Sequence, residues 1–297
     1  MIRKNNCATV ILTAVCGLFA FVPTVDATDW SVIGEDPKFP TDDVIVAFCS
    51  VTDPQYKLPA DPAAADCTPA IQRALDDASA AGGGTVFLPE SRYRLEGMLT
   101  IESNVVLRGR WSLIGPDRPA EGTILMIHNQ EHEQSVLLTG SGCGVRDLTF
   151  WHPEQQVMES AKSASKSPLV IRGQAGTVTI ENITLINPYR GIDLSQASAC
   201  CLRGIYGSPL HCGLSADRSF AVSRYDSIHF SPDYWSWSKL PDSPPEGGAH
   251  AAYMRKHGTG LHIYEMDGFY AGFSKISGYQ RSEEHTSELQ SRQYLVC

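Results

Sequence analysis

The chain has 297 residues, of which 42% are hydrophobic and 19% are charged, and its formal net charge is −9. This length can bury one substantial core or two smaller ones, and the composition is that of a globular protein rather than a disordered one. The chain is acidic overall and its sequence has no basic stripe that could bind a nucleic-acid backbone. We therefore expect no nucleic acid among its partners. A polyanionic substrate would need a local group of Arg and Lys, or a bound cation.

The first 27 residues have the pattern of a secretory signal peptide. Arg3 and Lys4 precede an uncharged, apolar stretch from Cys7 to Val25, and small residues follow at the expected cleavage point. The stretch is short and is interrupted by a glycine and a proline, which favours cleavage over a membrane anchor. We therefore predict a secreted or periplasmic protein with no stable membrane insertion after cleavage.

The other end of the chain resembles sequence of non-native origin. Residues 281–297 begin "RSEEHTSELQS", which resembles the translation of a sequencing-library adaptor and has no apolar periodicity. We interpret this segment as a non-native tail. The expected organisation is a single domain over residues 28–280, truncated at its C-terminal end.

Six cysteines remain between the leader and the tail, and in an exported protein they can form disulfides. Cys49 and Cys67 would close a loop rich in Pro and Asp, so we predict a disulfide between them. The alternative is that most of these cysteines are buried free thiols. No Cys/His spacing suggests a zinc site.

A short amphipathic helix is predicted to begin at Thr68 and to end at Gly82. Thr68 can serve as its cap, Pro69 suits the first turn, and glycine at 82 suits the C-terminal end. The apolar positions that share one face are Ile71, Ala74, Leu75 and Ala78.

After the helix, short runs rich in Val, Ile, Leu and Thr alternate with Gly, Pro and Asn, which predicts a succession of strands. The segments "VRDLTF", "IENITL", "LRGIYG" and "YDSIHF" align and place one apolar residue of each in a common column. These residues are Leu148, Ile183, Ile205 and Ile228, at steps of 35, 22 and 23 residues. A polar loop at 152–168 lengthens the first step, and a further step of 48 reaches Ile276.

A second column supports the first. Gly191 and Gly213 are also 22 residues apart, and the column would continue near Ser236. A repeat of this length predicts an all-β fold, a parallel β-helix whose coils stack at about 4.8 Å, with the short N-terminal α-helix capping its open end. An antiparallel sandwich or barrel is the alternative, and it would need no fixed period.

The stretch from Asp66 to Gly109, "DCTPAIQRALDDASAAGGGTVFLPESRYRLEGMLTIESNVVLRG", resembles the N-terminal signature of the pectate-lyase-like superfamily. The matching features are "AIQ.AL", "GGGTV..P" and "SNV.L.G", typical of its rhamnogalacturonase, epimerase and exo-β-1,3-glucanase branch. The resemblance implies a right-handed parallel β-helix. It also implies a secreted protein that acts on polysaccharides by hydrolysis, β-elimination or epimerisation, although function depends on the site rather than the scaffold.

Asp193 and Asp217 are the candidate catalytic pair. Asp193 aligns with Ser215, so Asp193 and Asp217 would project from adjacent coils roughly 8 Å apart, which suits an inverting glycoside hydrolase. The alternative is that an Asp next to a turn only hydrogen-bonds local backbone. The competing carboxylates are Asp226, Asp233, Glu265 and Asp267.

The aromatic loop between residues 231 and 258 supplies candidate substrate-binding residues. Tyr234, Trp235 and Trp237 could form a platform for sugar rings, or could pack the loop onto the solenoid. Arg255 lies in the basic run "MRKHG". In a lyase, such a base would act with Ca²⁺ bridging uronate and protein carboxylates.

The predicted function is therefore a glycoside hydrolase that acts on a plant or microbial cell-wall polysaccharide without a cofactor. A polysaccharide lyase, which could use Ca²⁺, ranks second, because the sequence contains neither a "DD" strand nor "GHG" and has only one tight basic cluster near the aromatic loop. A non-catalytic glycan-binding or adhesive β-helix is the third reading.

Overall fold

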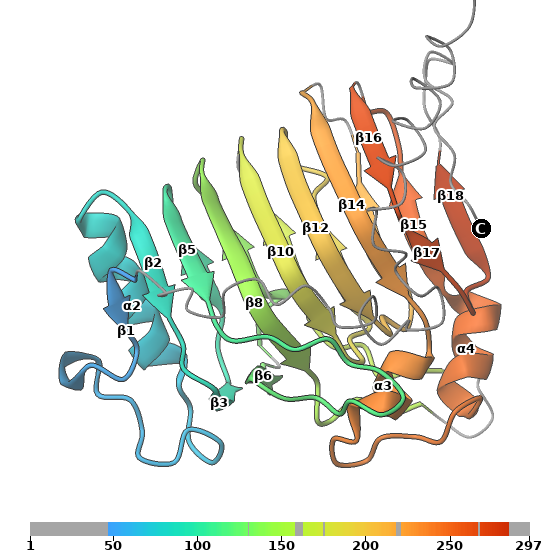
Figure 1. Cartoon of the computed structure of the whole chain (residues 1–297), viewed down its shortest axis with the longest axis horizontal. Coiled ribbons are helices and arrows are strands. Elements are labelled where there is room, and N and C mark those ends of the chain that lie inside the picture. The colour runs from blue at the N-terminus through green and yellow to red at the C-terminus, as the bar shows by residue number, and fades with distance from the viewer. Residues whose placement is uncertain are drawn as a thin grey trace, which may run out of the picture. The chain divides into compact units, whose positions relative to one another are not determined.

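The chain forms a parallel β-helix, in which each strand pairs in parallel with the strand of the next coil (Figure 1). The computed structural model describes residues 47–129, 131–157, 163–174, 176–217, 221–266 and 268–284. The predicted signal peptide at residues 1–27 lies outside the described residues. The parallel pairing agrees with the predicted β-helix, and parallel crossovers are nearly always right-handed.

The first sheet contains 11 strands in the described part of the chain, and its main path is β1-β2-β5-β8-β10-β12-β14-β16. The strands on this path are β1 (Cys49–Ser50), β2 (Gly84–Phe87), β5 (Val105–Arg108), β8 (Cys143–Trp151), β10 (Val178–Leu185), β12 (Cys200–Gly207), β14 (Ser223–Phe230) and β16 (Phe269–Gly272). Beside the path, β3 (Ser91–Leu95) pairs with β6 (Thr123–Ile127), β6 pairs with β8, and β17 (Lys275–Ile276) pairs with β14.

The second sheet has seven strands in the order β18-β15-β13-β11-β9-β7-β4, again within the described residues. These strands are β4 (Leu99–Ile101), β7 (Gln134–Leu138), β9 (Leu169–Gly173), β11 (Arg190–Asp193), β13 (Cys212–Ala216), β15 (Thr259–Ile263) and β18 (Arg281–Glu284). Because β18 pairs with β15, the first four residues of the predicted tail continue this sheet. Residues 285–297 lie outside the described residues.

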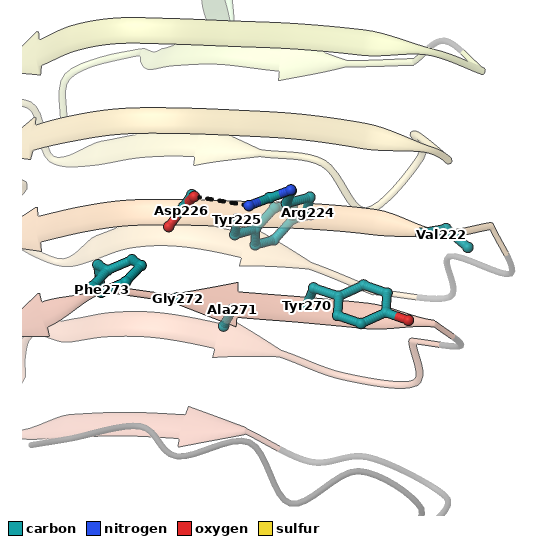
Figure 2. A pocket seen from close by; sticks show the side chains of 8 residues that line it. All are labelled: Val222, Arg224, Tyr225, Asp226, Tyr270, Ala271, Gly272 and Phe273. Carbon is teal, nitrogen blue, oxygen red and sulfur yellow. Dashed lines mark hydrogen bonds and ion pairs between the residues drawn. The ribbon is translucent and has the colours of Figure 1, made fainter. Parts of the chain in front are cut away.

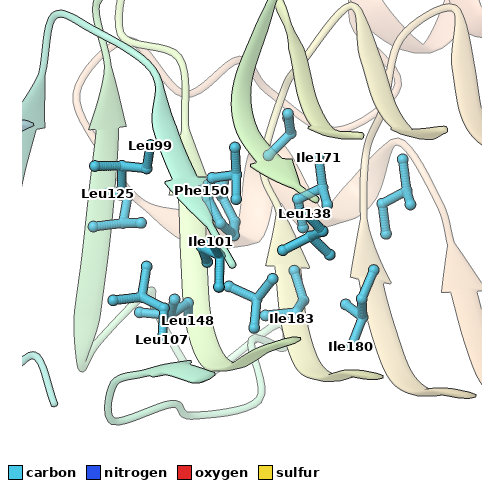
Figure 3. Packing of buried hydrophobic residues seen from close by; sticks show 14 of the residues in the cluster. Leu99, Ile101, Leu107, Leu125, Leu138, Leu148, Phe150, Ile171, Ile180 and Ile183 are labelled. Carbon is cyan, nitrogen blue, oxygen red and sulfur yellow. The ribbon is translucent and has the colours of Figure 1, made fainter. Parts of the chain in front are cut away.

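The predicted apolar column is confirmed. Ile183 pairs in register with Leu148 on one side and with Ile205 on the other, and Ile205 pairs with Ile228. All four side chains are buried in the solenoid core, and Figure 3 shows two of them, Leu148 and Ile183, on neighbouring coils. Each such residue contributes about 1.5 to 3 kcal/mol through removal of its apolar surface from water.

Two extensions of the repeat are wrong. Ile276 pairs with Phe230 rather than with Ile228, because the chain between these coils is two residues shorter than the predicted step. The glycine column of Gly191 and Gly213 continues at Gly260, not near Ser236, because an inserted segment separates the two coils. A β-carbon at Gly213 would lie 2.4 Å from the carbonyl oxygen of Gly260, which explains why the column is glycine.

The capping helix forms as α2 (Thr68–Ala80), and its predicted apolar face is buried against the first coils. Thr68 is the first helical residue rather than the cap, which corrects the predicted start. The carboxylate of Asp66 accepts hydrogen bonds from the N–H of Thr68 at 2.9 Å and from its hydroxyl at 2.6 Å. After the helix, Gly82 and Gly83 adopt φ values of 92° and 127°, which only glycine reaches without strain.

The long insertion after β14 forms two helices, α3 (Asp233–Ser238) and α4 (Ala249–His257). Their apolar side chains join a second hydrophobic cluster outside the solenoid core. In this cluster Trp235, Leu240 and Met254 meet Trp151 and Ile186 of neighbouring coils. The insertion is therefore packed onto the coils, and it brings side chains of α4 to the second sheet.

Candidate functional site

The two predicted catalytic carboxylates lie on the outer face of the second sheet. Asp193 ends β11 and pairs in register with Ser215 of β13, as predicted. Asp217 follows β13 directly, and both aspartates are half-buried. Because side chains alternate along a strand, Asp193 and Asp217 project on the same face from neighbouring coils.

Asp193 also has a local structural role. Its Oδ1 accepts a hydrogen bond from the backbone N–H of Ser195 at 3.0 Å and another from the Ser195 hydroxyl at 2.7 Å. In this arrangement Asp193 caps a turn, which is the structural role that the sequence predicted as the alternative to catalysis. One carboxylate oxygen is therefore engaged at the end of β11.

A row of polar side chains crosses the second sheet at the same register position. Arg172 of β9, Asp193, Ser215 and His262 of β15 follow one another at one residue per coil. Nη1 of Arg172 lies 3.5 Å from Oε2 of Glu133. Sequence reasoning did not single out Arg172 or His262, although the glycine column defines the register in which they lie.

A group of aromatic and basic side chains lies where the strands of this sheet begin. Arg190 opens β11, Tyr189 precedes it, and His211 occupies the equivalent place one coil later. The Tyr189 and His211 rings stack with centroids 4.7 Å apart and 7° between their planes. The N–H of His211 donates to the carbonyl of Tyr189 at 2.9 Å, which fixes the stack.

This group, here called the basic corner, consists of Lys166, Tyr189, Arg190, His211, Tyr253 and His257. Burial lowers the pKa of His211, and the positive charges of Arg190, His257 and Lys166 lower it further. The imidazole is therefore neutral at neutral pH, between cations that repel a proton. Nδ1 of His211 is buried and has no hydrogen-bond partner in the described structure.

The helix α4 completes the basic corner. Burial raises the pKa of Tyr253 to about 12, and the charge and hydrogen bond of Tyr189 add to the effect. The Tyr253 and His257 rings lie 4.9 Å apart between centroids. Tyr253 and His257 follow the first residue of β13 by 41 and 45 positions, and they reach the same site as Tyr189, which no local pattern predicts.

Cys212 links the basic corner to Asp193. Burial raises the pKa of the Cys212 thiol to about 11, the negative charge of Asp193 raises it too, and Arg190 opposes them. Both charges therefore lie close to this thiol. Two phenols, a neutral imidazole and two cationic side chains are gathered where the strands begin, and the carboxylate of Asp193 lies at the other end of β11.

Among the predicted substrate-binding aromatics, Tyr234 and Trp235 belong to the second hydrophobic cluster and are 9% and 4% exposed. Their burial favours the alternative, in which they pack the insertion onto the coils, and a role of these two in substrate binding stays a prediction. Trp237 is half-buried, and its Nε1 donates to Glu246 at 2.8 Å. It lines a cavity of about 170 Å³ together with Lys275, so Trp237 keeps some access to solvent.

Arg255 lies in the last turn of α4 and is exposed. Its positive charge contributes to lowering the pKa of His250, after burial, which acts in the same direction. The structure thus places the Arg255 side chain near His250 of the same helix, and its role in substrate binding stays a prediction.

The predicted Cys49–Cys67 disulfide is not formed. Both residues are buried free thiols. The Cys67 thiol donates to the carbonyl of Pro62 at 3.3 Å, whereas the Cys49 thiol faces the carbonyl of Ala74 at 4.0 Å. The two side chains therefore face different neighbours. The alternative prediction, that these cysteines are buried free thiols, holds for this pair.

Within the described ranges, no three His, Cys, Asp or Glu side chains come together in a way that could hold a metal ion. The same ranges contain no helix long and apolar enough to cross a membrane.

Comparison with known proteins shows the fold. A proposed glycosyl hydrolase from Parabacteroides merdae superposes with a TM-score of 0.53 at 13% identity, over 79% of this chain and 98% of that chain. The A-module of mannuronan C-5 epimerase AlgE4 from Azotobacter vinelandii covers 77% of this chain at 16% identity, with a TM-score of 0.35.

Sequence similarity to curated proteins is local. Mannuronan C5-epimerase AlgE3 of Azotobacter vinelandii is 53% identical over 53 residues, which is 16% of this chain and 3% of the epimerase. AlgE5 of the same organism is 53% identical over 51 residues, or 5% of its length. The chain thus matches only a small part of these relatives, and no family model matches it.

Proposed function

We propose that this protein is a secreted enzyme that acts on an acidic polysaccharide, with the basic corner as the site that binds a uronate residue. The observation that carries the proposal is the neutral His211 held among Arg190 and Lys166 in an otherwise acidic chain. Local similarity to mannuronan C5-epimerases and the fold shared with a proposed glycosyl hydrolase support a polysaccharide as the substrate.

The chemistry that suits this arrangement is proton transfer next to a carboxylate. Arg190 and Lys166 pair with the carboxylate of the sugar and stabilise the charge that develops when its C5 proton leaves. The neutral imidazole of His211 accepts that proton. The phenol of Tyr189, hydrogen-bonded to Tyr253, is the neighbouring group that can donate a proton.

Two outcomes follow from the same carbanion. If a proton returns to C5 from the opposite face of the ring, the sugar is epimerised and no bond of the chain is cut. If the bond between C4 and the glycosidic oxygen breaks instead, the chain is cleaved by β-elimination, the oxygen takes a proton, and a C4–C5 double bond remains.

The test is incubation of the full chain with polymannuronate and polygalacturonate in D₂O. We expect deuterium at C5, detected by NMR, if the sugar is epimerised, or ultraviolet absorbance of the unsaturated product if the chain is cleaved by elimination. Arg190→Gln and His211→Ala should abolish whichever signal the wild type gives. Arg92→Gln, which removes an exposed arginine of β3, is the matched control and should keep it.

Absence of deuterium exchange and of unsaturated product on both polymers would rule out this chemistry. The second candidate, an inverting glycoside hydrolase, is favoured by the shared face of Asp193 and Asp217, whose register implies a separation of roughly 8 Å. It predicts new reducing ends that Asp193→Asn removes. Glycan affinity without any turnover, unchanged by Asp193→Asn, would instead indicate a binding module.

A further inference from the structure

We propose a second saccharide-binding site on the first sheet, at a cavity of about 410 Å³ lined by residues of β14 and β16 (Figure 2). Its ligand is a neutral pyranose residue. The choice of a saccharide rests on the proposed function, but the site lies on a different sheet from the basic corner and shares no residue with it.

Exposed apolar side chains gather at this cavity. Val222, Tyr270 and Phe273 are 66%, 51% and 87% exposed, and all three line it. They are half of the large exposed hydrophobic residues in the described part of the chain. A single exposed apolar residue is ordinary, whereas a group around one cavity marks a binding surface.

The turn at Phe273 requires a positive φ in each coil, and phenylalanine is an unfavourable residue for that conformation. The φ of Phe273 is 48°, in the left-handed region that bulky residues avoid. The same turn in earlier coils holds Asn182, Gly204 and Ser227, which adopt this conformation with less backbone strain than phenylalanine. An aromatic side chain here adds strain and exposes a ring, a combination typical of functional positions.

The Asp226 carboxylate at this cavity favours a ligand that donates hydrogen bonds. Oδ2 of Asp226 lies 3.4 Å from Nη2 of Arg224, whereas Oδ1 is shielded and has no hydrogen-bond partner in the described structure. A β-carbon at position 272 would lie 3.0 Å from that Oδ1, so Gly272 leaves room beside the carboxylate. A carboxylate oxygen only accepts hydrogen bonds, and it repels a second carboxylate.

A neutral pyranose meets these requirements. Figure 2 shows the Tyr270 and Phe273 rings on the last coil, separated along the strand by Ala271 and Gly272, with the Arg224–Asp226 pair on the strand beside them. Aromatic rings bury the C–H surface of a sugar, and hydroxyl groups donate to a carboxylate and accept from a guanidinium. A uronate suits the basic corner better, because Arg190 and Lys166 form no ion pair with an Asp among the residues that the structure describes.

The test is isothermal titration of the full chain with cellohexaose, laminarihexaose and mannohexaose. At least one of these should bind, and Tyr270→Ala combined with Phe273→Asn should weaken that binding by about tenfold or more. Asn is chosen because Asn182 occupies the same turn, so the variant should fold. Phe48→Ala, which removes an exposed aromatic residue beside β1, is the matched control and should bind as the wild type does.

Lack of binding to all three hexaoses, or unchanged affinity in the double variant, would overturn the inference. So would loss of hexaose binding in Arg190→Gln, because the ligand would then occupy the basic corner. Hexaose binding that depends on Tyr270 and Phe273 in a protein with no turnover of acidic polymers would uphold this site while the proposed function fails.

Discussion

His152 offers a test of how burial governs stability in this solenoid. It follows β8, its side chain is 2% exposed, and neither ring nitrogen has a hydrogen-bond partner in the described structure. The side chain of Asn187 in the next coil holds its backbone through hydrogen bonds of 2.9 and 3.0 Å. The ring is therefore buried, and neither nitrogen has a described partner that could stabilise its protonated form.

Burial lowers the pKa of His152 to about 3 from an ordinary value of 6.5, and the charge of nearby His128 contributes. Above pH 6.5 the ring is neutral in both states. Below it the unfolded chain takes up the proton and the folded chain does not, so stability falls as the pH falls until the folded pKa is reached. From pH 7 to 4.5 the loss is about 2.5 kcal/mol.

The assay is urea denaturation of the wild type and His152→Gln at several pH values over this range. Other buried histidines, such as His250, also lose stability on acidification, so the informative quantity is the difference between the two proteins. We expect the wild type to lose about 2.5 kcal/mol more than the variant. Parallel curves would show that the ring is protonated or solvated in the folded state, and would refute the reasoning.

Three further predictions concern the core, the basic corner and the strained turn. Ile183→Ala should lower the free energy of unfolding by about 2 to 5 kcal/mol, measured by urea denaturation, because its neighbours in the stack cannot close the cavity; a loss below 1 kcal/mol would contradict the packing. The activity of the proposed enzyme should persist below pH 6.5 and fall only as the lowered pKa of His211 is passed, since the base must be neutral. Arg190→Gln removes a cation that lowers this pKa, so any residual activity should show an acid limb moved to higher pH. Phe273→Asn should raise the unfolding free energy by about 1 kcal/mol, because Asn tolerates a positive φ; a lower thermal midpoint would count against strain at this turn.

The basic corner and the packed insertion could not be read from the sequence. Lys166, Tyr189, His211 and His257 are far apart along the chain, and they meet because coils of unequal length return to the same edge. Trp235 was a candidate for sugar binding, and it is buried because its loop folds back on the coils. For such a loop, composition does not specify which face of an aromatic ring meets protein and which meets solvent.

The sequence by itself determined the capping helix, the parallel coils and the register of Leu148, Ile183, Ile205 and Ile228. Those features follow from the fixed periods of helix and strand, which backbone geometry imposes on any chain that must bury its apolar side. Only the tertiary structure decided that Cys49 and Cys67 face different neighbours and that α4 reaches the edge of the second sheet. The path of an insertion and the direction of one side chain depend on contacts between distant segments, and no local period encodes them.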